Sequence, residues 1–474
     1  MKKIISIFLL AALFIMSGCS GSVSDSSGDV SSDTTAFDTT ASDTTQTVTD
    51  VPDEKFEMRE DQVYAADILD TTEVISIAFM GGSLTNGGIA YNKYIPNWPS
   101  SDNAWVNETI SYFVTGGQGG KQVRQVKAWN AALPGTQSSY AAARFMKQVA
   151  ANEPDIIFLE YSANDSGWNP EIASVYYEQI IRMCLSLDKI PVIIFVHAPM
   201  PITETSSTYE KYIQGIAAKD ALAEHYGIKT INAYEYLKEL YAADNKGLSF
   251  LDWLGTKGTG FYNEVYEGYY DVHPNRSGYS VYSGAVKAAL DSDFDGYMSR
   301  PKFVDIYNKG YENIILSSYN LIPQNDERIE YEGEWTEYTL ENMFITDDRN
   351  IGIGDHQYKY PYFVEGIRQT IDPVSSSFTF KTKASYIAIA YMSATYGSNV
   401  TFYLVNEDGS NGEMLGTIQT EQNVEAMGMG MDFSSGEVRL PAGGGEYTVR
   451  GVVEEKNDLH KIFRFGYIIE CFEK

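Results

Sequence analysis

Cysteine and histidine are scarce in this chain, with 3 and 5 examples in 474 residues. The sequence has no closely spaced cysteine pair, no His-Glu-x-x-His motif, no histidine-rich cluster and no EF-hand spacing, so it implies neither a metal nor a cofactor. Apart from Cys19, the two cysteines Cys184 and Cys471 allow at most one disulfide. Because Cys184 lies within an apolar helical pattern, a buried free thiol is the favoured interpretation.

Basic residues are also few. Lysine and arginine number 35 against 64 aspartate and glutamate residues, which gives a formal net charge of −29. Binding to nucleic acid or to anionic lipid headgroups requires clustered positive charge, so neither is an expected partner. The same charge weakly disfavours polyanionic glycans, although salt screens exposed charges beyond roughly 8 Å.

The N-terminus has an apolar run of only about a dozen residues after Lys2 and Lys3, too short to span a bilayer comfortably. It predicts an export signal over residues 1–19. Residues 16–19, Met-Ser-Gly-Cys, resemble a bacterial lipobox, which implies lipidation of Cys19 after cleavage. Simple secretion and an uncleaved anchor are the alternatives. We expect a lipid anchor in the bacterial cell membrane, with the protein facing outside.

Residues 20–55 are mostly Ser, Thr, Asp, Gly and Val. Such a segment cannot bury enough apolar surface to offset the entropy of ordering it. We predict a disordered tether that holds the rest of the protein away from the cell surface. This arrangement suits a substrate that is too large to enter the cell.

Residues 56–300 alternate short apolar runs with longer helical patterns. Predicted strands lie at residues 74–80, 154–161, 190–198 and 228–233, and predicted helices at residues 138–153, 174–189, 208–227 and 275–292. Ser138 is the expected cap of the first of these helices. Strands that are apolar on both faces and separated by helices indicate an α/β fold with a parallel sheet covered on both sides.

Beyond residue 300 the pattern changes to short alternating or aromatic-rich runs, separated by turns of Gly, Asn, Asp and Ser. These runs predict an antiparallel β-sandwich domain over residues 331–474, a candidate for carbohydrate binding. Residues 301–330 are the predicted connector. Two domains also agree with the length after the tether, which exceeds one ordinary core.

Three short segments carry residues that a serine esterase needs: FMGGSLT (79–85), YSAND (161–165) and DVHPN (271–275). A serine hydroxyl is a poor nucleophile at neutral pH, so it needs an imidazole to accept its proton and fixed donors for the oxyanion that forms. The first two segments follow predicted strands. In parallel sheets the ligand site lies beyond the carboxyl ends of the strands, so we expect the segments to meet there.

In order and spacing these segments resemble those of the SGNH hydrolases, also called GDSL esterases, over about residues 70–295. The resemblance implies a flavodoxin-like three-layer α/β/α domain. It implies that Ser83 is the nucleophile and His273 the general base and then acid. The oxyanion hole that it implies is formed by the amides of Ser83 and Gly135 and the side chain of Asn164.

Three residues next to these positions either support the proposed site or depart from the family pattern. Asp165 is implied to hold the loop that carries the oxyanion donor. Gly82 stands where the family often has Asp before the serine, and Ser162 stands where glycine is usual. The first departure concerns the support of the nucleophile loop, not the nucleophile.

The acid that orients the histidine is less defined. The family pattern is Asp-x-x-His, whereas here Asp271 lies two positions before His273. On an extended segment residues i and i+2 share a face, so Asp271 is the first candidate. Glu267, Asp252, a backbone carbonyl or a Ser-His dyad are the alternatives.

Aromatic and histidine residues near the motifs are further candidates. Trp168 and Trp98 have faces that can stack on sugar rings, although packing is the commoner use of tryptophan. His197 ends a predicted strand, from which it can flank the site. The remaining histidines fit structural roles.

We therefore expect a carbohydrate esterase that removes O-acetyl groups from a neutral polysaccharide through an acyl-enzyme. The alternatives are an O-acyltransferase acting on a surface glycan and, from another class, a glycan-binding lipoprotein without catalysis. A lipase is disfavoured because the sequence shows no amphipathic lid and is strongly acidic.

Overall fold

The structure is a computed structural model. It describes residues 56–69, 74–86, 105–117, 125–133, 136–167, 169–206, 208–256, 259, 261, 273–274, 276–338, 367–371, 376–391, 398–419, 438–441, 445–454 and 463–474. Arg59–Lys474 forms one compact unit. None of the helices in the described ranges combines the length and apolarity needed to cross a bilayer.

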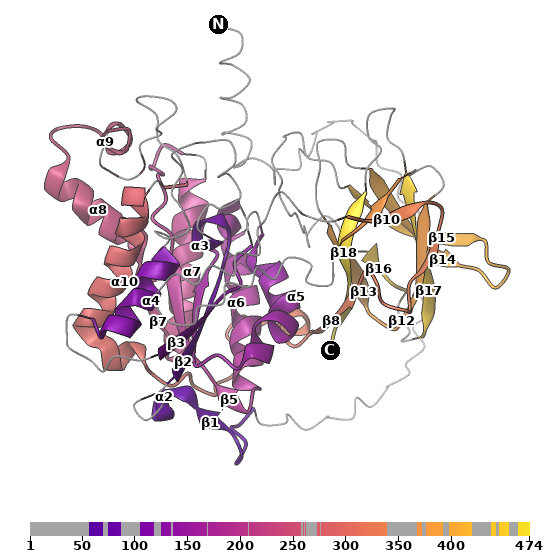
Figure 1. Ribbon diagram of the computed structural model, residues 1–474, viewed down its shortest axis with the longest axis horizontal. Helices are drawn as coiled ribbons and strands as arrows, with labels where there is room; N and C mark the ends of the chain where they lie inside the picture. The colour runs from indigo at the N-terminus through magenta and orange to yellow at the C-terminus, as the bar shows by residue number, and fades with distance from the viewer. Residues whose placement is uncertain are drawn as a thin grey trace, which may run out of the picture. The chain divides into compact units, whose positions relative to one another are not determined.

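A parallel five-stranded sheet organises the first half of the structure (Figure 1). Its strands are β2 (Val74–Gly81), β3 (Gln125–Asn130), β4 (Ile156–Glu160), β6 (Val192–His197) and β7 (Lys229–Asn232). Their order across the sheet is β3-β2-β4-β6-β7, and every pair is parallel. In chain order this is 2-1-3-4-5, the flavodoxin-like arrangement. The predicted fold class is therefore confirmed.

Helices cover both faces of this sheet (Figure 1). The connection from β2 to β3 runs in one direction across the sheet, and the later connections run in the other. Because each connection is a right-handed crossover, the helices of the first connection and those of the later ones lie on opposite faces. Helices α4 (Trp105–Thr115) and α10 (Arg276–Tyr297) pack together, as do α5 (Ser138–Gln148), α6 (Pro170–Leu185) and α7 (Tyr209–Tyr226) in series.

The remaining elements of this half are short. They are β1 (Val63–Tyr64), which pairs with β5 (Lys189–Ile190), α2 (Ala65–Ile68), α3 (Ser83–Asn86), η3 (Ala150–Asn152), η4 (Asn164–Gly167), α8 (Ala233–Asp244) and α9 (Phe250–Leu254). Helix α6 begins four residues before its predicted start because the Asn169 side chain caps the amide of Glu171 at 3.0 Å and Pro170 fits the first turn.

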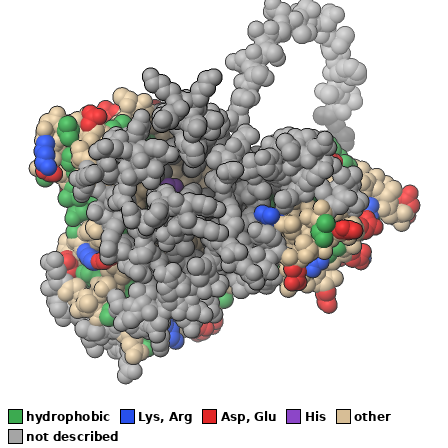
Figure 2. Space-filling view, turned by 45° about the horizontal axis from the view of Figure 1, so that its top comes forward, with side chains coloured by type: hydrophobic (Ala, Val, Ile, Leu, Met, Phe, Trp, Pro, Cys, Tyr) green, Lys and Arg blue, Asp and Glu red, His purple; other side chains and the backbone are tan. Residues whose placement is uncertain are grey.

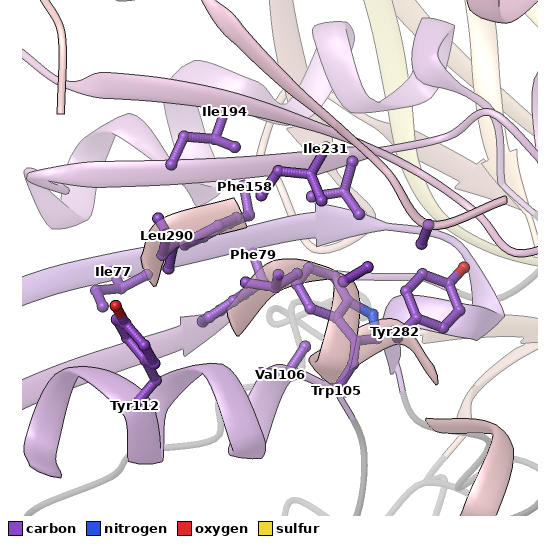
Figure 3. Packing of buried hydrophobic residues seen from close by; sticks show 14 of the residues in the cluster. Ile77, Phe79, Trp105, Val106, Tyr112, Phe158, Ile194, Ile231, Tyr282 and Leu290 are labelled. Atoms are coloured by element: carbon purple, nitrogen blue, oxygen red, sulfur yellow. The ribbon is translucent and has the colours of Figure 1, made fainter. Parts of the chain in front are cut away.

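The core of this half is aromatic where β2, β4, α4 and α10 meet. Phe79 and Phe158, on neighbouring strands, stack with ring centroids 5.1 Å apart. Trp105 meets Phe79 edge-on at 5.4 Å and stacks on Tyr282 at 5.7 Å. Figure 3 shows these side chains converging beneath the sheet. All four are fully buried, so the strand that precedes the nucleophile segment is held on a rigid base.

Two antiparallel sheets form the second half and enclose their own core. One contains β10 (Trp335–Tyr338), β11 (Ile367–Thr370), β18 (Arg464–Phe472), β13 (Tyr386–Tyr391) and β16 (Val438–Arg439), with β8 (Ser318–Pro323) also paired to β18. The other contains β15 (Asn411–Gln419), β14 (Asn399–Val405), β17 (Tyr447–Glu454), β12 (Ser377–Thr382) and β9 (Glu330–Glu332). The predicted antiparallel architecture is confirmed.

Residues 301–330, predicted as a connector, contain secondary structure. They include α11 (Glu312–Ile315) and strand β8, and the Gln179 side chain on α6 donates to the carbonyl of Ile314 at 2.7 Å. Strand β8 pairs along its full length with β18. This segment therefore supplies a strand to one of the antiparallel sheets.

Both cysteines in the described ranges, Cys184 and Cys471, are buried and unbridged. The free thiol predicted at position 184 is confirmed. Burial raises the pKa of the Cys184 thiol, so it stays protonated and unreactive.

Removing the stacked ring of Phe158 is the sharpest test of this core. Because Phe158 is fully buried, Phe158→Ala is expected to lower the free energy of unfolding by about 3–5 kcal/mol, measured by urea denaturation. The control is Met146→Ala, at a side chain that is 47% exposed on α5, with an expected change within about 0.5 kcal/mol. Equal effects of the two substitutions would contradict the packing described.

Candidate active site

Ser83 lies at the carboxyl end of β2, where the chain turns directly into the short helix α3. The amide of Asn86 donates to the carbonyl of Gly82 at 3.0 Å, which closes this turn. Ser83 itself is only half-buried. A strand that turns sharply into a helix leaves the side chain at the turn exposed to a ligand, as at other nucleophile turns.

The two glycines before Ser83 are required by close neighbours. A Cβ on Gly81 would overlap the side chain of Thr85, and a Cβ on Gly82 would overlap the side-chain oxygen of Asn164 and lie 2.9 Å from its nitrogen. The Asn164 amide therefore lies directly against the nucleophile turn. With Asn164 in this position there is no room for a side chain at Gly82.

His273 completes the central pair. Its Nε2 lies 2.8 Å from Oγ of Ser83, although the two residues are 190 positions apart in the chain. At this distance Nε2 can accept the hydroxyl proton when the ring proton is on Nδ1. The structure therefore brings together the hydroxyl and the imidazole that the sequence predicted.

The loop after β4 carries Asn164 and Asp165 at the start of η4. Strands β2 and β4 are neighbours, with Gly81 opposite Glu160, so this loop meets the nucleophile turn at the same edge of the sheet. Side-chain amides of asparagine are good donors to a developing oxyanion. The position of Asn164 fits that use.

Asp165 anchors this loop through two buried contacts. Its Oδ1 accepts the amide of Ser138 at 3.1 Å, and its Oδ2 lies 3.0 Å from Nζ of Lys219, with both side chains 1% exposed. The expectation that Ser138 caps α5 is wrong: Gln137 is the residue before the helix, and no side chain at that position caps it. The carboxylate of Asp165 satisfies the free amide instead, because an anion is stabilised at a helix N-terminus.

Glu160 is a residue near the site that the sequence analysis missed. It ends β4, is fully buried, and accepts a hydrogen bond from the Thr85 hydroxyl at 2.8 Å. Burial raises the pKa of its carboxyl from 4.5 to about 7, because a charged form is poorly solvated in the interior. A glutamate that ends an apolar strand was the available signal in the sequence.

Several predicted residues lie outside the described ranges. These are Asp271, Gly135, Trp168, Trp98, Cys19 and the alternative acid Glu267. Asp252, another alternative, is engaged at the start of α9, where the Ser249 hydroxyl donates to its carboxylate at 2.6 Å. The roles proposed for these residues stay predictions.

His197 is a buried structural residue and not an open flank of the site. It is fully buried, and its Nε2 lies 2.9 Å from Oδ1 of Asp220. His225 contacts the carbonyl of Asp305 at 2.7 Å. Within the described ranges no group of three or more His, Cys, Asp or Glu residues is arranged to hold a metal ion.

This region of the sequence has a family match. Residues 79–281 match the model of the GDSL-like lipase/acylhydrolase family, and they include Ser83, Asn164 and His273. These residues form an SGNH, or GDSL-like, hydrolase domain. No curated protein sequence matches the chain.

Solved structures share the fold of the SGNH domain and of the region after it. A two-domain esterase, CEX, active on acetylated mannans has a TM-score of 0.57 at 15% identity, over 86% of this chain and 94% of that chain. Its co-crystal structure with mannopentaose has a TM-score of 0.56 at 15% identity, over the same 86% and 94%. Axe2, an acetylxylan esterase from Geobacillus stearothermophilus, matches at 15% identity with a TM-score of 0.34, over 49% of this chain and 96% of that chain. At 15% identity the CEX match shows a common fold.

The close approach of Gly82 to Asn164 gives a test of the SGNH site. In Gly82→Ala the new methyl group must displace the Asn164 side chain, and we expect kcat/KM for a small acetyl ester to fall at least about 100-fold. The control is Gly215→Ala on α7, where a Cβ meets only ordinary contact at 3.6 Å. That control is expected to keep full activity, and an active Gly82→Ala enzyme would contradict the geometry.

The buried carboxyl of Glu160 predicts a pH-dependent stability. Because its pKa is raised from 4.5 to about 7, the native state holds a proton that the unfolded state loses, and this contribution disappears as pH rises through that window. Relative to Glu160→Gln, the wild type is expected to lose about 3 kcal/mol between pH 4.5 and pH 7.5. Urea denaturation of both proteins across this range measures the difference, and a constant difference would contradict the prediction.

Proposed function

We propose that this protein is a serine ester hydrolase that removes O-acetyl groups from a neutral polysaccharide. The observation that carries the proposal is the 2.8 Å separation of Ser83 Oγ and His273 Nε2 at the carboxyl edge of the sheet. The SGNH family match supports ester hydrolysis as the class of reaction. The pairing also disfavours a purely glycan-binding protein, because binding alone requires no nucleophile beside a base.

The proposed reaction has two steps. His273 takes the proton of Ser83 as its oxygen attacks the acetyl carbon, and the oxyanion is stabilised by the amides of Ser83 and Gly135 and by the Asn164 side chain. The tetrahedral intermediate collapses, and the sugar oxygen leaves with the proton from His273. Water, deprotonated by His273, then attacks the acetyl-Ser83 ester, and His273 returns the proton to the Ser83 oxygen as acetate is released. Asp271 is the proposed partner that orients the imidazole.

The substrate class rests on three supports. CEX, which shares the two-domain fold, is active on acetylated mannans. The net charge of −29 disfavours polyanionic glycans. Figure 2 shows acidic side chains at the surface of the C-terminal β-region, where Glu407, Asp408, Glu413 and Glu446 are exposed. A neutral acetylated mannan or xylan meets no such repulsion.

Substrate contacts and location complete the proposal. Trp168 and Trp98 follow the oxyanion and nucleophile segments and are proposed to stack on sugar rings. The β-region is proposed to bind glycan beyond the cleavage site. Lipidation at Cys19 is proposed to hold the enzyme at the outer cell surface, where polymeric substrates are accessible.

Acetate release from acetylated mannan and acetylated xylan tests the proposal. The wild-type protein is expected to release acetate, and Ser83→Ala is expected to lower the rate by at least about 1,000-fold because the nucleophile is lost. The control is Ser206→Ala, at a serine in the loop before α7, with an unchanged rate expected. Equal release by Ser83→Ala and wild type would end the proposal. Release from neither glycan, with intact hydrolysis of small acetyl esters, would overturn the substrate class alone.

A further inference from the structure

Glu160 lies between the two loops that carry the proposed catalytic groups. It is the last residue of β4, and it is paired with Gly81 at the end of β2. The nucleophile follows Gly81 by two positions, and the oxyanion donor Asn164 follows Glu160 by four. The carboxylate is therefore at the point where the two chains diverge.

The carboxylate is hydrogen-bonded to both loops. Its Oε2 accepts the hydroxyl of Thr85 at 2.8 Å, two residues after Ser83. Its Oε1 accepts the hydroxyl of Ser162, two residues before Asn164, at 3.5 Å. One side chain thus joins the nucleophile turn to the oxyanion loop.

A charge at this position is costly for folding. Glu160 is fully buried, and well-packed apolar residues are often as stable as buried charges or more stable. Packing alone therefore does not account for a glutamate here. Its hydrogen bonds to two functional loops supply a reason for its presence.

Among the described residues, Glu160 is surrounded by a lysine, a second carboxylate and several tyrosines. Lys219 favours the ionised form of Glu160 and Asp165 opposes it. The titratable groups that face it from the elements packed around it are Lys219 and Tyr212 on α7, Asp165 on η4, Tyr161 after β4, Tyr177 on α6 and Tyr282 on α10. The hydroxyl of Thr85 and the amide of Ala163 also favour ionisation.

We propose that Glu160 is a positioning residue for hydrolysis, whose carboxylate fixes the Ser83 hydroxyl relative to the Asn164 amide by binding the hydroxyls of Thr85 and Ser162 together. The inference rests on the proposed function of Ser83. Catalytic geometry must hold within about 0.5 Å, and a displacement of about 1 Å can cost 100-fold in rate. A bridge between the two loops meets this requirement without contacting substrate.

The first test compares Glu160→Gln with Glu178→Gln. Glu178 is also fully buried and hydrogen-bonded, but its partners are Tyr226 and Asn308, away from the nucleophile turn. With 4-nitrophenyl acetate, Glu160→Gln is expected to lower kcat by about 10–100-fold with KM within about 2-fold. Glu178→Gln is expected to keep kcat. Equal kcat in Glu160→Gln and wild type would overturn the proposal.

The pH profile separates positioning from a merely structural role. If both the general base and Glu160 must be deprotonated, the acid limb of log kcat/KM approaches a slope of about 2, and in Glu160→Gln a slope of about 1. A profile unchanged in shape by Glu160→Gln would count against the proposal.

A second pair of variants keeps the test valid if Glu160→Gln does not fold. Thr85→Val removes the donor to the carboxylate, so it is expected to lower kcat and to move the acid limb to higher pH, because the hydroxyl holds the Glu160 pKa down. Thr85→Ser retains a hydroxyl and is expected to restore both. Identical profiles for the Val and Ser variants would overturn the proposal.

Labelling of Ser83 separates this inference from the proposed function. A wild-type protein that neither reacts with a fluorophosphonate probe nor hydrolyses the ester would contradict the function itself. A reactive wild type with unaffected Glu160→Gln and Thr85→Val variants would contradict only the positioning role.

Discussion

The site depends on one topological constraint, the reversal of strand order between β2 and β4. The chain leaves β2 in one direction across the sheet and leaves β4 in the other, so the helices that follow them depart to opposite faces. In doubly wound sheets, ligands bind between the neighbouring strand ends at such a reversal. Gly82 and Asn164 lie at this reversal, which explains how residues 82 positions apart come into contact.

The buried polar groups near these strand ends show how function and stability compete. Glu160, Asp165 and Lys219 occupy positions where apolar side chains would be easier to accommodate. Glu160 accepts a hydrogen bond from Thr85 on the nucleophile turn. Asp165 belongs to the oxyanion loop and accepts the amide of Ser138 at the start of α5. Functional sites commonly retain such unfavourable groups, since activity requires a fixed geometry more than maximal stability.

The sequence was sufficient to predict the site residues that lie in short local motifs. Ser83 follows a strand and two glycines, and His273 belongs to a short motif, so both could be named without coordinates. Glu160 could not, because it ends an otherwise apolar strand and its partner Thr85 is 75 residues away. The capping of α5 was misread for the same reason: the carboxylate that caps it comes from another loop. Strand β3 was missed because its alternating polar residues conceal it among buried strands.

Cys184 and Cys471 lie in separate regions of the structure, each shielded from solvent and neither cross-linked. The described part of the chain therefore folds without a disulfide. An oxidising folding environment forms no disulfide between these cysteines, and a reducing environment has no disulfide to break. Material made in the cytoplasm of a laboratory host needs no thiol oxidase or disulfide isomerase to reach the native state.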